Sequence, residues 1–280
     1  MNPSSDPSSA TPPAPASTPP PRYVFPRWAN YLLPLLLIGG LGGGMYMPVL
    51  IGLGLNPDTL NKNYRPEQPI PYSHELHVGQ LGMDCTYCHT SVKDAAFAAI
   101  PPTETCLTCH TAVKPESPKL DPLFRSAYAY LDATTNKPTP DAGTADKPNK
   151  PNPDAGMPVR WVKIHDNPDY AYFNHAAHVT KGVGCNTCHG RVDRMGEEGV
   201  HQHANLSMGW CIDCHRAPEK HLRPPSEVTN MAYTPLDDAE VIAKGITNLK
   251  EAQLLVGTRV KADYNVHNAA YMQSCSTCHR

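Results

Sequence analysis

The sequence predicts a mostly irregular fold with short α-helices, plus one N-terminal transmembrane helix. Large apolar side chains are too scarce for an ordinary core: hydrophobic residues make up 40% of 280 residues, with four Phe against 31 Pro and 19 Gly. A run without charged residues, from Tyr31 to Leu55, is long enough to span a bilayer. A sizeable ordered domain after this run therefore needs a filling other than apolar side chains.

The cysteines indicate what that filling is. All ten fall into Cys-x-x-Cys-His motifs, and none is left over for a disulfide. In this motif two thioethers attach one porphyrin, and the adjacent His binds the iron as proximal ligand. The five motifs are Cys85/Cys88/His89, Cys106/Cys109/His110, Cys185/Cys188/His189, Cys211/Cys214/His215 and Cys275/Cys278/His279. We expect five covalently bound haem c groups, with the irregular domain organised around them.

Three other chemistries use paired cysteines: structural zinc, a dithiol redox motif and a disulfide framework. Zinc needs four ligands per site and gives no reason for a His after every second Cys. A dithiol motif normally occurs once, whereas this pattern occurs five times. The repetition favours haem over all three.

The N-terminal region is expected to have two parts. Residues 1–21 are Ser, Pro, Ala and Thr with one charge, which predicts a disordered tail. Residues 22–57 are expected to form an anchor helix. A cleaved signal peptide is the alternative, but its apolar region is usually shorter, and no Ala-x-Ala follows here.

Arg22 and Arg27 precede the span and favour a cytoplasmic N-terminus. This orientation puts the expected haem domain, residues 58–280, on the periplasmic side of the bacterial inner membrane. Gly39/Gly43 and Gly40/Gly44 are small-x-x-x-small pairs that let another helix approach closely. We expect partner membrane helices there, although a helix that merely tolerates glycine is the alternative.

The haem domain contains an internal duplication. A His-x-x-His pair precedes the first motif, and the pair recurs 101 residues later, from His74 to His175 and from His77 to His178. The first motif of the block recurs after 100 residues and the second after 105. The sequence thus predicts two copies of a two-haem unit, with a fifth motif appended at the end.

Other segments carry less information. Residues 136–157 are rich in Pro, Asp, Ala and Lys and predict a flexible, solvated insertion. Asp237–Leu255 is the best helix candidate outside the motifs, with apolar residues near one face. The formal charge is −2 and no basic patch is present, so nothing indicates nucleic-acid binding.

The remaining histidines decide the class of function. A sixth iron ligand makes a haem an electron carrier, whereas an open position makes it a site for a substrate or a gas. Nine histidines lie outside the motifs. We expect five of them to be distal ligands: His74, His77, His175, His178 and His267. His267 lies eight residues before Cys275, the same offset as His77 before Cys85.

Met208, three residues before the fourth motif, is the rival for a distal position. A thioether ligand raises the potential of a haem, although a methionine there is more often in packing contact with the porphyrin. Weaker ligand candidates are His165, His201 and His203, and His221 is expected at the surface. Arg216 and Arg223 could pair with haem propionates, with solvated charge as the equal alternative.

The His-x-x-His pairs before Cys-x-x-Cys-His resemble the class III multihaem cytochromes. More specifically, the chain resembles the pentahaem cytochrome c subunit of bacterial alternative complex III from Arg22 to Arg280, apart from the insertion. The matching stretches are Tyr64–His74, Trp161–His165, Pro168–Asp169, Phe173–His175, Cys188–Met195, Ser207–Cys211 and the terminal Cys275–Arg280.

That resemblance implies a non-catalytic electron-transfer subunit. Its partners would be quinone-binding membrane subunits, an iron–sulfur protein subunit, and a cytochrome c or terminal oxidase as acceptor. Two other functions stay open: a stand-alone membrane-anchored quinol dehydrogenase of the periplasmic nitrate-reduction type, and a multihaem reductase enzyme. The reductase often has Lys in place of one motif His, whereas all five motifs here end in His.

Overall fold

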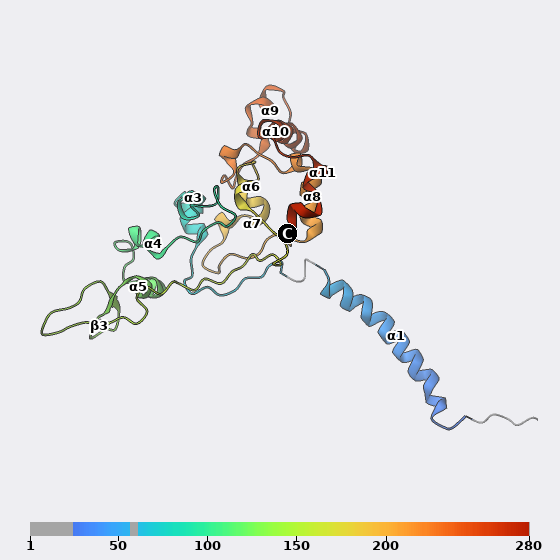
Figure 1. Cartoon of the computed structure of the whole chain (residues 1–280), viewed down its shortest axis with the longest axis horizontal. Coiled ribbons are helices and arrows are strands. Elements are labelled where there is room, and N and C mark those ends of the chain that lie inside the picture. The colour runs from blue at the N-terminus through green and yellow to red at the C-terminus, as the bar shows by residue number, and fades with distance from the viewer. Residues whose placement is uncertain (1–24, 57–60, 280) are drawn as a thin grey trace, which may run out of the picture. The chain divides into compact units, whose positions relative to one another are not determined.

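The computed structural model describes residues 25–56 and 61–279. The chain divides into two compact units, one ending at Gly54 and one beginning at Leu55 (Figure 1). The predicted tail, residues 1–21, lies outside the described residues.

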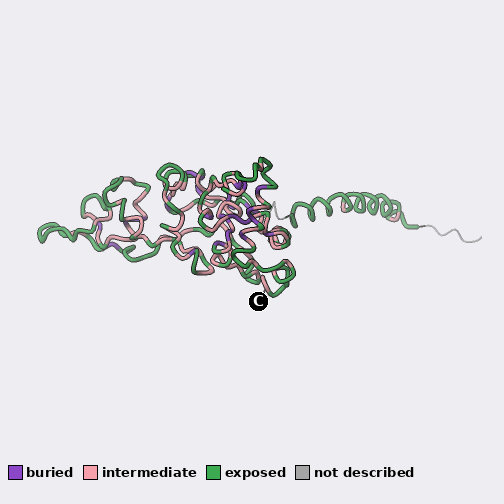
Figure 2. Tube along the Cα trace, turned by 90° about the horizontal axis from the view of Figure 1, so that it is seen from above, coloured by how far each residue is buried: buried purple, intermediate pink, exposed green. Residues whose placement is uncertain are grey.

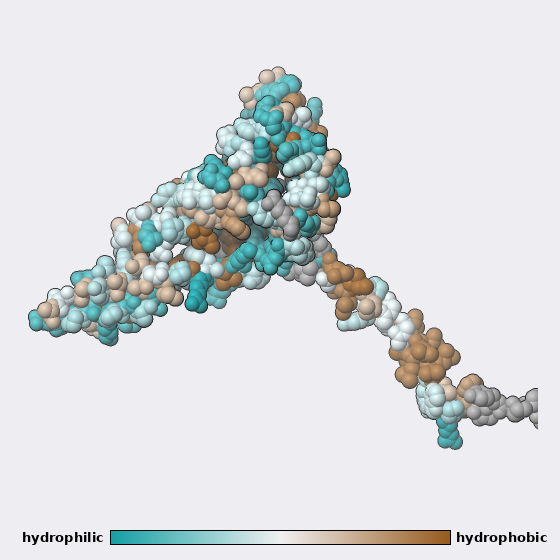
Figure 3. Space-filling view, viewed as in Figure 1, coloured by the Kyte–Doolittle hydropathy of each residue, from teal (hydrophilic) through white to brown (hydrophobic). Residues whose placement is uncertain are grey.

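The described part of the first unit is dominated by one helix, α1 (Ala29–Gly54). Its 26 residues span about 39 Å at 1.5 Å per residue, more than the roughly 30 Å of a bilayer's hydrocarbon core. The helix contains Pro34 and Pro48, and its large apolar side chains are exposed (brown in Figure 3). By length and composition α1 can cross a membrane.

The second unit consists of short helices joined by long irregular segments, which confirms the predicted fold type for the described residues. Each Cys-x-x-Cys-His motif lies on a short helix: α3 (Cys85–Cys88), α4 (Thr103–His110), α7 (Cys185–His189), α8 (Met208–Arg216) and α12 (Cys275–Cys278). The other helices are η1 (Glu75–Gln80), η2 (Pro118–Leu120), α5 (Asp121–Ala127), α6 (His175–Val179), η3 (Val192–Arg194), η4 (Pro218–Lys220), η5 (Pro225–Glu227), η6 (Pro235–Asp237), α9 (Ala239–Ala243), α10 (Leu249–Asp263) and α11 (Ala269–Met272).

Polar residues immediately before several of these helices explain where they begin. Asp84 accepts a hydrogen bond from the backbone N–H of Thr86 at the start of α3, and Ser207 accepts one from Trp210 at the start of α8. Asn174 does the same for α6. Such caps satisfy backbone donors that have no partner inside the helix. Two of the five motif helices, α3 and α8, are capped in this way, whereas α4, α7 and α12 begin without a side-chain cap.

The helix predicted over Asp237–Leu255 is wrong as one element, because two helices lie there. Asp238 caps α9, which ends before Gly245, and Asn248 caps α10, which runs on to Asp263. Gly245 has a φ of 64°, a left-handed conformation that ends helices and that glycine adopts without strain.

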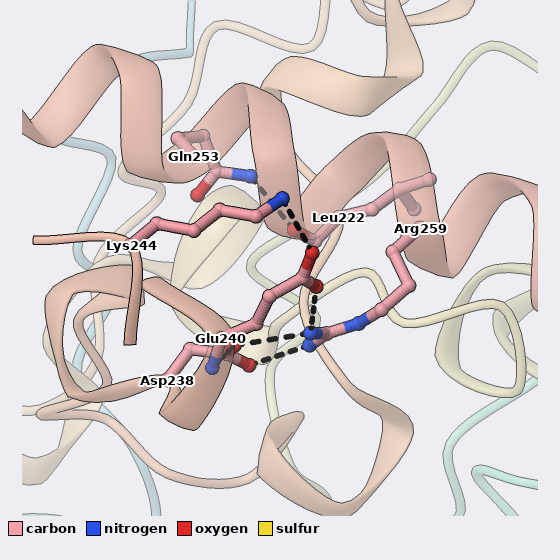
Figure 4. A network of polar contacts seen from close by, with 6 residues as sticks. All are labelled: Leu222, Asp238, Glu240, Lys244, Gln253 and Arg259. Carbon is pink, nitrogen blue, oxygen red and sulfur yellow. Dashed lines mark hydrogen bonds and ion pairs between the residues drawn. The ribbon is translucent and has the colours of Figure 1, made fainter. Parts of the chain in front are cut away.

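The main apolar cluster lies where α10 packs against α9 and the segment around η4. Its buried members are Leu222, Val241, Ala252, Val256 and Val260 (purple in Figure 2). Polar contacts reinforce this region: Arg259 on α10 pairs with Asp238 and Glu240, and Gln253 Nε2 donates to the backbone oxygen of Leu222 (Figure 4). The C-terminal helices thus have a small core of their own.

Part of the predicted insertion, residues 136–157, has regular structure. β2 (Pro138–Thr139) and β3 (Lys150–Pro151) both pair antiparallel with β1 (Tyr130–Leu131), in the order β2-β1-β3. Asn152 is buried, and its side-chain amide donates to the backbone oxygens of Arg125 and Tyr128. The segment therefore packs on α5, although most of it is exposed, and its flexibility stays a prediction.

We expect Val256→Ala to lower the free energy of unfolding by about 2 kcal/mol, because the Val256 side chain is fully buried and its removal leaves a cavity. Denaturant titration followed by far-UV circular dichroism measures the change. Leu249→Ala, at an exposed position of the same helix, is the control and should change stability far less.

Candidate functional site

None of the ten motif cysteines forms a disulfide in the structure. Burial raises the pKa of Cys188 to about 12 and that of Cys214 to about 11. A reactive dithiol needs a lowered pKa, because the thiolate is the nucleophile. Burial also raises the pKa of Cys211, so the fourth motif lacks the environment of a redox-active dithiol. The third motif differs, because the pKa of Cys185 is lowered, chiefly by the neighbouring Cys85.

Two of the predicted haem-binding cysteines, Cys109 and Cys275, are exposed, whereas the other eight are partly buried. Cys109 lies on α4 and is exposed, whereas Cys185 and Cys188 of the third motif are partly buried. Its sulfur lies 3.9 Å from the hydroxyl oxygen of the neighbouring Thr108. The structure therefore encloses the second motif less than the third, and the attachment of a haem at Cys109 stays a prediction.

Four of the five motif histidines are oriented by one kind of contact. The Nδ1 atoms of His89, His110, His215 and His279 lie 2.7, 2.9, 2.9 and 3.0 Å from the backbone oxygens of Ala99, Val113, Met272 and Tyr170. A carbonyl oxygen only accepts, so Nδ1 carries the proton and the Nε2 of the neutral ring keeps its lone pair. This is how proteins commonly fix an imidazole that binds a metal.

The fifth motif histidine, His189, is distinguished by its burial. Burial is the largest cause that lowers its pKa, to about 3, followed by the neighbouring His165 and His175. The ring is therefore neutral at physiological pH and can act as an electron-pair donor.

The repeated His-x-x-His pairs lie on, or directly before, the short helices η1 and α6. Nδ1–H of His77 donates to the backbone oxygen of Ser73 at 2.8 Å, and that of His178 donates to Asn174 at 2.7 Å. Nδ1–H of His175 donates to Ala96 at 2.8 Å, across the two repeats. These bonds again leave Nε2 free on each ring.

His74 differs from the other three, because its Nδ1 is buried without a hydrogen-bond partner. Its pKa is lowered to about 4, first by burial and then by the neighbouring His89 and His77. His74 is thus neutral and lies near the proximal histidine of the first motif.

The structure brings three of these histidines opposite motif histidines at a nearly constant separation. The ring centroids of His77 and His110 are 6.2 Å apart, those of His175 and His189 are 6.4 Å apart, and those of His178 and His215 are 6.1 Å apart. Rings in direct stacking contact lie closer, as Tyr72 and His77 do at 4.4 Å. Both repeats therefore pair the second histidine of His-x-x-His with the second motif of their own block.

Two other predicted ligands are not brought opposite a motif histidine. The His267 ring contacts Tyr271 at 4.1 Å, and Met208 is 65% exposed at the start of α8. The His279 ring lies 5.9 Å from Tyr170. Among the described ring contacts, none joins His279 to a second histidine.

His165, ranked below the paired histidines from sequence, lies against the third motif. Its ring meets that of His189 edge-on at 4.4 Å, and its buried Nε2 has no hydrogen-bond partner. Its pKa is lowered to about 4, first by burial and then by His201, His175 and His203. Its place in the Trp161–His165 stretch of the resemblance was the sequence signal for it.

The protein side chains alone do not form a metal site. Within residues 25–56 and 61–279, no three side chains of His, Cys, Asp or Glu converge on one point where a metal ion could bind. Each histidine pair offers two ligands, whereas structural zinc takes four. A metal between the rings would thus need ligands from another source.

We compared the chain with known proteins. No family model matches the chain. Over 197 residues it is 28% identical to the menaquinone reductase, multihaem cytochrome c subunit of Nitratidesulfovibrio vulgaris, a match that covers 64% of this chain and 80% of the relative. The similarity supports a multihaem cytochrome c. It does not single out the alternative complex III subunit that the sequence resembles.

Proposed function

We propose that this chain binds five haem c groups and is a non-catalytic electron-transfer subunit of a quinone-linked membrane complex. The observation that carries the proposal is the repeated separation of 6.1–6.4 Å between paired imidazoles beside the motifs. Two metal–imidazole bonds of about 2 Å in line, plus about 1 Å from each nitrogen to its ring centroid, give about 6 Å. Tetrahedral ligation would bring the centroids closer together.

The residues present fit a haem with two axial imidazoles. A porphyrin would supply the four ligands that each histidine pair lacks, and the two cysteines of a motif would attach it. We assign His89, His110, His189, His215 and His279 as proximal ligands. Their distal partners would be His74, His77, His175, His178 and, for the fifth motif, His267 or Met208. A bis-imidazole haem supplies one-electron transfer, with no open position for a substrate.

The contacts that the protein makes with these histidines then serve to position them as ligands. The Nδ1–H bonds to backbone oxygens hold each ring in one orientation, and burial keeps His74 and His189 neutral and able to donate an electron pair. The two histidines of each His-x-x-His reach different motifs, so one short helix fixes the distance between two neighbouring haems.

The name of the relative supports a quinone-linked complex as the setting. We infer that α1 anchors the chain in the bacterial inner membrane beside quinone-binding subunits, with the haem domain in the periplasm. An iron–sulfur protein subunit would deliver electrons, and a cytochrome c or terminal oxidase would accept them, as in alternative complex III. The relative is called a menaquinone reductase, which favours a second candidate: a subunit that carries electrons toward menaquinone. Whether a terminal oxidase or a periplasmic electron donor co-purifies with the complex distinguishes the two directions.

We expect the purified full-length protein to be red and to contain five haems c per chain. Alkaline pyridine haemochrome absorbance, divided by protein concentration from amino-acid analysis, measures the number. A colourless protein that contains zinc would contradict the proposal.

We expect His77→Ala to convert one haem to a high-spin form that binds carbon monoxide at about one equivalent per chain, because the sixth ligand is lost. His221→Ala, outside all ring pairs in the described residues, is the control and should bind none. The same titration on His267→Ala and Met208→Leu identifies the fifth distal ligand. Stoichiometric binding by the unaltered protein would instead favour a multihaem reductase.

We expect Gly43→Leu to reduce the recovery of partner subunits when the complex is solubilised in mild detergent. The substitution fills the Gly39/Gly43 surface of α1, where nothing lies within 4 Å of the side-chain carbon that would be added. Gly52→Leu, also in open space but outside the glycine pairs, should leave recovery unchanged. Mass spectrometry of the affinity-purified complex measures the ratio. Purification of the unaltered chain alone with quinol dehydrogenase activity would contradict the subunit assignment.

A further inference from the structure

The two repeated blocks contact each other beside the first and third motifs. The backbone N–H of His175 donates to the oxygen of Ala96 at 3.0 Å, and that of Ala176 donates to Ala95 at 3.1 Å. The helix that carries the second His-x-x-His, α6, is thus attached to the loop that follows α3 of the first block.

A segment outside both blocks' histidine pairs joins the same two motifs. This segment, Leu222–Met231, lies between the fourth motif and α9. The backbone N–H of Cys185 donates to the oxygen of Val228 at 2.9 Å, and Thr229 Oγ1 donates to Asp84 Oδ2 at 2.8 Å. Asp84 is the N-cap of α3, and Cys185 is the first residue of α7. Two consecutive residues therefore connect the starts of the first and third motif helices.

Apolar packing supports this connection. Val228 is 2% exposed and packs with Val92, which follows the first motif, and with Val179, which ends α6. This cluster is separate from the core around α10, so it serves the contact between the blocks.

Arg223 ties the segment to the third motif. Its Nη2 donates to Asn186 Oδ1, inside that motif, at 2.8 Å, and its Nη1 donates to the backbone oxygen of Asn230 at 3.0 Å. The guanidinium also lies 4.7 Å from the centre of the Tyr233 ring. One side chain therefore joins the segment to the third motif, with one donor on Asn186 and the other on Asn230.

The residue before Cys185 makes room for this contact. A side-chain carbon at Gly184 would lie 2.3 Å from Arg223 Cζ, an impossible overlap. Glycine is therefore required if the guanidinium is to lie against the backbone at the start of α7.

We propose that Leu222–Met231 is a clamp that fixes the first haem against the third, and that Arg223 is its positioning residue. The inference rests on the proposed function, because it assumes a haem at each motif. With haems bound, electrons would cross between the two repeats beside this segment, and the haems would follow the order second, first, third, fourth. We place the fifth haem beside the fourth, because Nδ1–H of His215 donates to the backbone oxygen of Met272, three residues before the last motif.

The test uses the purified full chain and the variants Arg223→Gln, Arg223→Lys and Thr229→Val. Spectroelectrochemical titration gives the midpoint potentials, and electron paramagnetic resonance reports coupling between neighbouring ferric haems. We expect all three variants to keep five haems but to shift two of the five potentials and to lose the coupled signal of one haem pair. Arg223→Lys should have the same effect as Arg223→Gln, because lysine keeps the charge but not the planar guanidinium that donates hydrogen bonds in fixed directions.

Two matched controls separate positioning from general loosening. Thr229→Ser keeps the hydroxyl and should behave like the unaltered chain. Arg259→Gln removes an equally well-bonded arginine from the C-terminal helices and should leave potentials and coupling unchanged.

Three results would overturn the proposal: unchanged potentials and coupling in Thr229→Val, full restoration by Arg223→Lys, or the same shifts in Arg259→Gln. If Arg223→Gln fails to fold, the Thr229→Val and Thr229→Ser pair decides alone. Fewer than five haems in the unaltered chain would contradict the proposed function instead, so the two failures are distinguishable.

Discussion

A hydrogen bond from imidazole Nδ1–H to a backbone oxygen recurs at seven histidines of the second unit, and the site depends on it. Each bond fixes the tautomer and the direction of the ring, so that Nε2 faces away from its own backbone. The acceptors lie on segments far apart in the sequence for His175, His215 and His279. The same contact that orients a proposed ligand therefore also joins one part of the chain to another.

The candidate site could be predicted from short, local sequence patterns, and its ligand assignments stay predictions. A Cys-x-x-Cys-His motif specifies its own function within five residues, and the duplication identified the His-x-x-His pairs as a set. Which ring faces which motif could not be predicted, since His77 and His110 are brought together by tertiary contacts. For the same reason the edge-on contact of His165 with His189 could not be predicted from sequence.

The fold was less predictable in the segments without motifs. The apolar periodicity of residues 237–255 is real, but a left-handed glycine and a new cap divide it between α9 and α10. The composition of residues 136–157 indicated a solvated loop. The two strands in it form because they pair with residues 130 and 131, which the composition of the segment cannot show. Local propensity is a weak guide wherever a few tertiary hydrogen bonds decide the conformation.

The small apolar clusters of the second unit have a consequence for how the protein matures. Clusters of a few valines, alanines and a leucine stabilise far less than the core of an ordinary domain of this size. With the proposed haems, porphyrins would form most of the interior of this unit, and they would be attached only after export. Folding would then follow cofactor attachment step by step, and a chain that missed one haem would stay open to periplasmic proteases, so attachment itself would act as quality control.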